Sequence, residues 1–110
     1  MTYQSIAALA ASTGLPTAYY QFPETAHVAP PFLVWLVTGS NDAYADGRNY
    51  QKIESCQMEL YTDAKDFGME KTVEAALAGA GISWRKDEGF LDSERMHMTT
   101  YQFDVVITEE

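Results

Sequence analysis

The stretch PFLVWLVTGSNDAYADG, residues 31–47, changes character in its middle and sets the plan of the fold. Its first part, residues 32–38, is a continuous apolar run of strand length, which is typical of a strand covered on both faces. We therefore expect this strand to lie centrally in a sheet. Its second part, residues 39–47, is rich in Gly, Ser, Asn and Asp, which predicts a loop, and this loop also carries Tyr44.

The residues before this stretch predict a helix, a strand and an extended loop. Apolar residues recur at helical spacing within residues 2–13, with Thr2 as the N-cap and Gly14 just beyond the end. Residues 17–22 are rich in β-forming side chains and predict a strand. The prolines of residues 23–31 exclude a regular ladder there.

The residues after the loop predict one long strand with an irregular start. Residues 49–62 alternate between apolar and polar side chains around Cys56, which indicates a strand with one wet face. The apolar parity switches further upstream. This switch indicates either a bulge near Glu54 and Ser55 or a long hairpin arm that projects beyond the core.

A second helix and a hairpin complete the predicted fold. Helical spacing of apolar residues predicts a helix over residues 68–81, with Glu70 and Glu74 on its solvated outer face. Residues 82–88 and 96–108 predict two strands of a hairpin. The order is therefore α-β-β-β-α-β-β, an α+β fold with a mainly antiparallel sheet and two helices on one face. The length predicts a single domain, residues 1–110.

Composition excludes several classes of partner. Sixteen Asp and Glu residues against seven Lys and Arg residues give a net charge of −9, which argues against stable nucleic-acid binding. No apolar run approaches the roughly 20 residues that a membrane-spanning helix needs. The lone cysteine, Cys56, cannot form an internal disulfide and falls in a strand pattern, so we expect a buried structural thiol.

The loop matches a calcium-binding pattern only in part. Asp42, Asp46 and Gly47 stand at its first, fifth and sixth positions. Tyr44 and Ile53 occupy the third and twelfth positions, where oxygen ligands are needed, and the surroundings predict strands instead of helices. We interpret the acidic residues as turn formers and predict no metal site.

No catalytic motif is visible in the chain, and we predict a protein without enzymatic activity or cofactor. His27 and His97 lie far apart in the sequence, and neither has a ligand at metal spacing. Ser40 lacks the spacing of a nucleophile elbow, and no Gly-rich phosphate-binding sequence is present.

The chain has more aromatic residues than one small sheet can cover. Tyr and Trp are favoured at the centres of protein interfaces, so the surplus predicts a protein partner. The alternative is that several of these side chains cap the sheet ends or the open face. The surplus residues are Tyr19, Tyr20, Tyr44, Tyr50, Trp84 and Phe90.

The sequence as a whole resembles the tail terminator or tail-completion family of long-tailed bacteriophages and prophages, similar in kind to the tail terminator of phage lambda. The resemblance covers nearly the whole chain. It is carried by LPTAYYQFPE, APPFLVWLVTGSNDAYADGRNYQKIESCQMELYTD, EKTVEAAL and GISWRKDEGFLDSERMHMTTYQFDV.

This resemblance implies a structural, non-enzymatic protein of the virion tail, assembled in the bacterial cytoplasm. Members of the family form a ring, typically of six subunits, that ends the tail tube and offers a face for head attachment. The implied partners are copies of the chain, the tail-tube protein and a head-completion protein, while DNA passes through without stable binding.

The loop after the apolar strand supplies the candidate residues for such contacts. Its length and its tyrosine favour a role in touching the tube or a neighbouring subunit. The candidate interface residues are Asn41, Asp42, Tyr44, Asp46, Arg48 and Tyr50. Two alternatives remain open at this point. One is a neighbouring head-tail connector, and the other is a module that binds a small molecule or peptide between Trp35, Trp84 and Tyr101.

Overall fold

The computed structural model describes residues 1–23, 26–40, 43–45 and 48–108, and for residues 43–45 and 48–51 it describes the backbone alone. The elements follow the predicted order, with one additional short strand pair inserted after the second strand. They are α1 (Tyr3–Ala11), β1 (Thr17–Tyr19), β2 (Phe32–Ser40), β3 (Ala43–Ala45), β4 (Arg48–Gln51), β5 (Ile53–Thr62), α2 (Phe67–Gly79), β6 (Arg85–Leu91) and β7 (Met96–Val106).

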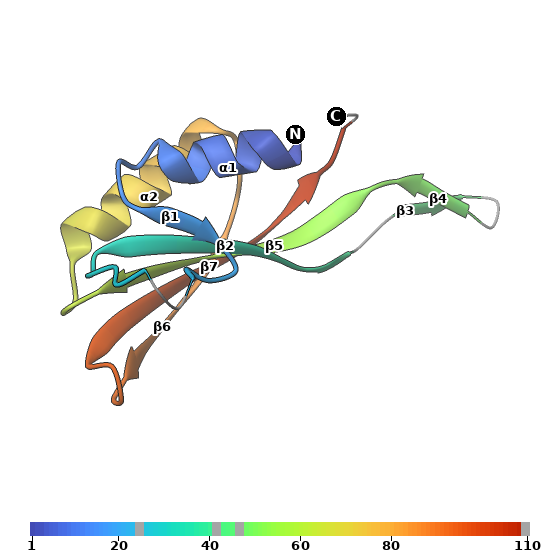
Figure 1. Cartoon of the computed structure of the whole chain (residues 1–110). Helices are drawn as coiled ribbons and strands as arrows, with labels where there is room; N and C mark the ends of the chain where they lie inside the picture. The colour runs from blue at the N-terminus through green and yellow to red at the C-terminus, as the bar shows by residue number, and fades with distance from the viewer. Residues whose placement is uncertain (24–25, 41–42, 46–47, 109–110) are drawn as a thin grey trace.

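Five strands form one sheet, and both helices cover the same face of it (Figure 1). The spatial order is β1-β2-β5-β7-β6; β1 and β2 pair in parallel, and every other pair in this sheet is antiparallel. The predicted α+β class, the mainly antiparallel sheet and the placement of both helices are confirmed. The apolar strand β2 lies inside the sheet, next to the central strand β5.

Alternation along β5 builds the core between the sheet and the helices. Cys56, Met58 and Leu60 are at most 2% exposed and point to the helical face, where Val73 and Leu77 of α2 are fully buried. Burial raises the pKa of the Cys56 thiol to about 11, so the thiol stays protonated at neutral pH. The prediction of a buried structural cysteine is confirmed.

Local side-chain chemistry fixes the ends of both helices. The Thr2 hydroxyl accepts a hydrogen bond from Ser5 N at 3.0 Å and starts α1, as predicted. The Asp66 carboxylate accepts from Met69 N at 3.0 Å and starts α2. Gly81 then ends α2 with a φ of +75°, a conformation that glycine adopts without steric cost.

The predicted loop over residues 39–47 is wrong in part. β2 continues to Ser40, because Gly39 and Ser40 pair with Ser55 and Glu54 of β5 across a register shift near Thr38. The additional residue of this bulge therefore lies on β2, opposite Cys56 and Ser55 of β5, whereas β5 itself pairs with β7 without a shift. Residues that pair through the backbone alone leave little trace in an apolar pattern.

Beyond this point the chain forms a two-stranded ribbon, which we call the arm, made of β3 and β4. The predicted single strand over residues 49–62 is divided into β4 and β5, and the ribbon projects away from the five-stranded sheet (Figure 1). The prediction of a projecting hairpin arm is confirmed. The molecule is accordingly elongated, with extents of 49 × 29 × 23 Å.

Two predicted strands have shifted ends. The strand predicted over residues 17–22 stops at Tyr19, because Tyr20 has a φ of +71° and Gln21 N turns back to donate to Tyr19 O at 2.8 Å. The strand predicted over residues 82–88 begins only at Arg85. Ile82 instead closes the helix end by donating its N–H to Leu77 O at 3.0 Å.

Candidate functional site

The arm contains the interface residues that the sequence pattern singles out. Tyr44 lies in β3, opposite Asn49 of β4, whereas Arg48 and Tyr50 lie in β4 itself. The other three candidates, Asn41, Asp42 and Asp46, lie outside the described residues. Within the described part of the chain, β3 and β4 pair only with each other. An isolated two-stranded ribbon is marginally stable in water.

Exposed aromatic side chains gather at the two opposite edges of the five-stranded sheet. At the β1 edge, Tyr19 is 51% exposed and Tyr20 is 64% exposed. At the β6 edge, Phe90 is 49% exposed, and Phe67 at the start of α2 is 68% exposed. The sequence prediction that the surplus aromatics lie outside the core is confirmed for Tyr19, Tyr20 and Phe90. Trp84 is half-buried and packs against the core.

The β6 edge also carries a cluster of ion pairs that connects it to α2. Lys65 Nζ lies 2.9 Å from Glu70 Oε2 and 2.6 Å from Glu88 Oε1. Lys86 Nζ lies 2.7 Å from Glu70 Oε1 and 2.8 Å from Glu74 Oε2. We call these five residues the lysine–glutamate cluster. It ties β6 and the turn before α2 to the first two turns of the helix.

Glu70 is the centre of this cluster, and its predicted place on a solvated outer face is wrong. Its side chain is only 3% exposed and lies between the helix and the strands. Burial opposes the charged form of this carboxylate. The hydrogen bonds from Lys86 and Lys65 outweigh that effect and lower the pKa of Glu70 below its ordinary value. Both lysines come from outside the helix, so the helical pattern gave no sign of them.

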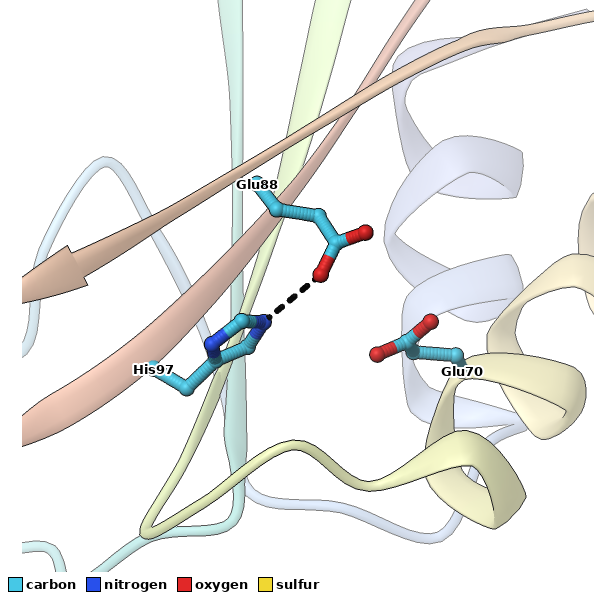
Figure 2. A group of neighbouring side chains, drawn as sticks. All are labelled: Glu70, Glu88 and His97. Atoms are coloured by element: carbon cyan, nitrogen blue, oxygen red, sulfur yellow. Dashed lines mark hydrogen bonds and ion pairs between the residues drawn. The ribbon is translucent and has the colours of Figure 1, made fainter.

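Figure 2 shows that Glu70 and Glu88 point toward His97, the only histidine with a carboxylate partner among the described residues. His97 Nε2 lies 3.1 Å from Glu88 Oε1. The antiparallel register of β6 and β7 creates this contact, because it places Phe90 opposite His97 and Glu88 two residues away. One donor atom from each of the three residues lies within 4.8 Å of the others, a spacing that a metal ion could bridge.

The chemistry of the cluster argues against a metal there. The Lys65 ammonium already contacts both carboxylates, Glu70 and Glu88, and supplies the positive charge that a cation would bring. A hydrogen bond to Glu88 and another to Glu70 raise the pKa of Lys65, so it stays charged. A metal ion would have to displace this lysine. We therefore interpret the group as an internal ion-pair cluster.

The uncovered face of the sheet carries a line of hydrogen bonds across three strands. Arg85 Nη2 donates to Gln102 Oε1 at 2.8 Å, and Gln102 Nε2 donates to Gln57 Oε1 at 3.4 Å. Gln57 Nε2 and Tyr61 Oη both donate to the Glu59 carboxylate, at 2.6 and 2.8 Å. These side chains satisfy one another's hydrogen-bonding groups. Such an arrangement suits a sheet face that is exposed to water.

The alternative site between Trp35, Trp84 and Tyr101 does not assemble, and that prediction is wrong. Tyr101 is fully buried on the helical face, where its hydroxyl donates to Glu74 Oε2 at 2.9 Å. The Trp84 ring lies 6.3 Å from the Tyr101 ring, but Trp35 packs 4.6 Å from Tyr19 at the other edge of the sheet. The strand β5 separates the two groups.

A groove of about 850 Å³ runs beside the end of β7. It is lined by residues 80–85 and 102–106, together with Met1, Thr38, Ser55 and Cys56. The Met1 amine donates to Val106 O at 3.0 Å. No serine or cysteine in the described part of the chain hydrogen-bonds to a histidine, so the groove presents no nucleophile and base in contact.

Two further findings concern membrane-spanning helices and similarity to known protein sequences. Neither helix of the described chain is long and apolar enough to cross a membrane. No protein-family model and no curated protein sequence matches the chain.

Among solved structures, the chain is similar in fold to a chain of a structure described as "Virion of native gene transfer agent (GTA) particle". The two superimpose with a TM-score of 0.64 and 18% sequence identity. The match covers 96% of this chain and 87% of that chain. The likeness extends over nearly all the elements described above, and it shows that the two chains share a fold.

Proposed function

We propose that the chain is a structural, non-enzymatic protein of a bacteriophage or prophage virion. In this role it forms a ring on the end of the tail tube, completes the tube and offers a face for joining the head. Its location is then the virion tail, after assembly in the bacterial cytoplasm. The observation that carries the proposal is the fold shared with a chain of a virion particle over 96% of the present chain.

Three features of the chain support this role. The arm is a two-stranded ribbon that pairs with no other strand of the described chain, as expected of an element that reaches a neighbouring molecule. Exposed aromatic residues at two opposite sheet edges suit contacts between copies. A net charge of −9 suits a channel through which DNA passes, because acidic surfaces repel the phosphate backbone.

The arm is the part that we assign to contacts with the tube or a neighbouring subunit. Tyr44 and Arg48 are its most informative residues, because tyrosine and arginine are the types that contribute most at interface centres. Replacing both by alanine should weaken assembly by about tenfold or more, since two such side chains each contribute more than about 1 kcal/mol. The monomer should remain folded.

The measurement is electron microscopy of the protein mixed with the tail-tube protein of the same phage, scored for capped tube ends. A matched control replaces Gln4 and Lys71, which are exposed on the two helices, by alanine. Circular dichroism verifies that each variant is folded. Normal capping of tubes by the Tyr44→Ala, Arg48→Ala variant would refute the assigned role of the arm.

A head-tail connector is the second candidate function, because the virion chain with the shared fold is described without its position in the particle. The same experiment distinguishes the two roles. A terminator caps tube ends and stops their growth, whereas a connector binds the head assembly and leaves tube growth unchanged.

A further inference from the structure

The two sheet edges that carry exposed aromatics are unlike each other, and this difference is informative. The β6 edge combines Phe67 and Phe90 with cations: Lys65 Nζ lies 4.8 Å from the centre of the Phe67 ring, and the Arg95 guanidinium lies 5.9 Å from that of Phe90. We call these four residues the β6 patch. They are linked in space, because Lys65 also binds Glu88, two residues from Phe90.

The β1 edge offers tyrosine rings and no cation. Tyr19 and Tyr20, which we call the β1 patch, are both more than half exposed. Residues 1–47, which include α1, β1 and β2, contain no Lys or Arg, whereas four of the seven basic residues of the chain lie in or beside β6. These four are Lys65, Arg85, Lys86 and Arg95. The basic side chains are thus concentrated at one edge of the sheet, where acidic side chains such as Glu70 and Glu88 accompany them.

The two patches are chemically complementary. A cation is attracted to the face of an aromatic ring, with tyrosine among the better partners, and Phe–Tyr ring contacts add to the buried apolar area. Arg95 makes no ion pair within the described residues, so its charge is available at the surface. Two β1 patches facing each other would lack this cation, and two β6 patches would bring like charges together.

We infer that the β6 patch of one copy packs against the β1 patch of a second copy of this chain. The inference rests on the proposed function in assuming that copies associate, and it names the surfaces that meet. Because the patches lie at opposite edges of one sheet, the contact is heterologous. Each added copy leaves one patch of each kind free, so copies extend into a row, and this row closes as a ring when the rotation between neighbouring copies brings its two ends together.

Side chains, not a continuous sheet, make this contact. β1 is three residues long, and the Tyr19 carbonyl already accepts a hydrogen bond from Gln21 N. The Tyr19 hydroxyl is likewise occupied, because it accepts from Val37 N at 3.2 Å. The β1 edge therefore offers little backbone for pairing, and its exposed rings are what a neighbour can bind.

Disulfide trapping tests the contact. One chain carries Gln21→Cys and Ser93→Cys together, which places a thiol at an exposed position beside each patch and keeps every patch residue. The protein is oxidised alone at high concentration and again when bound to tube ends. We expect a ladder of covalent dimers, trimers and larger species on a non-reducing gel. The native Cys56 does not interfere, since it is 2% exposed and its thiol has a pKa of about 11. Adding Arg95→Glu should reduce the ladder several-fold.

The controls separate this contact from other arrangements. Each single variant can form dimers at most. The pair Gln21→Cys with Val106→Cys keeps the thiol beside the β1 patch and places the second thiol at an exposed site outside the β6 patch. A dimer from Ser93→Cys alone that is as abundant as the ladder would show a symmetric β6 contact and overturn the inference. A ladder no stronger than that of the control pair in both settings would also overturn it. If capped tubes still form in that case, the proposed function stands while the assigned surfaces are wrong.

Discussion

Glu70 is the residue whose surroundings decide most about how α2 is held to the sheet. Its carboxylate forms ion pairs with Lys65 and Lys86. Lys65 also pairs with Glu88, and Lys86 also pairs with Glu74. A buried charge of this kind costs free energy to desolvate, and that cost is recovered only when its partners are in place. The geometry therefore specifies one position of the helix over the strands.

Replacing Glu70 by glutamine should destabilise the protein by about 2 kcal/mol. This is below the roughly 3–5 kcal/mol that breaking a buried ion pair costs, because both lysines retain another carboxylate. The free energy of unfolding is measured by urea titration at neutral pH. The matched control is Glu94→Gln, which removes one negative charge from the exposed turn between β6 and β7.

The pH dependence of the free energy of unfolding gives a second test of the role of Glu70. The pKa of Glu70 in the folded chain lies below its ordinary value of 4.5, so the carboxylate stabilises the fold in full above that value. The contribution is lost as the pH falls through the lowered pKa. We expect the loss of stability below about pH 4.5 to be shallower in Glu70→Gln than in the unaltered chain. Equal slopes would contradict the role given to Glu70.

At the scale of elements, two glycines at the C-terminal end of α2 show how short sequence signals act. Gly81 has a φ of +75°, whereas Gly79 lies inside the last helical turn with no heavy atom within 4 Å of an added Cβ. The same substitution at the two positions should therefore have opposite signs.

Gly81→Ala should lower the free energy of unfolding by about 1 kcal/mol, because alanine is strained at positive φ. Gly79→Ala should raise it by about 0.5 kcal/mol, because alanine has the higher helix propensity. Thermal and urea unfolding of the two variants measure both values. If both substitutions destabilise equally, the left-handed turn does not explain how α2 ends.

Elements with a strong local signal were predictable, and those stabilised by pairing alone were not. Three predicted features depend only on residues that are close together in the sequence, and all three are confirmed. They are the N-cap at Thr2, the end of α2 at Gly81 and the alternation along β5. The extension of β2 to Ser40 was missed, because its last residues pair with β5 through the backbone. The arm was predicted only as one of two explanations for the switch in apolar parity.

At the scale of the whole molecule, net charge and its distribution govern association. Each copy carries a charge of −9, so copies repel at long range, while the cations beside β6 attract only at short range. The contact between edges therefore depends on screening the repulsion.

Raising the salt concentration from about 0.02 M to about 0.5 M should strengthen self-association several-fold, because it shortens the Debye length well below the size of the molecule. Sedimentation velocity across this range, at fixed protein concentration, measures the effect. Sodium chloride is preferred over sulfate, which strengthens apolar contacts by a separate route. Weaker association at high salt would mean that short-range ion pairs dominate the contact between copies.

The sequence by itself determined the order of elements, the class of fold, the buried Cys56 and the surplus of aromatic residues. Each of these depends on residues close together in the chain, where periodicity and capping act. Only the tertiary structure decided that Glu70 is buried between two lysines, and that Glu88 and His97 meet. It also decided that the exposed rings lie at two opposite edges. These facts depend on strand order and register, which bring together residues distant in the sequence, and no local pattern encodes which strands become the edges of the sheet.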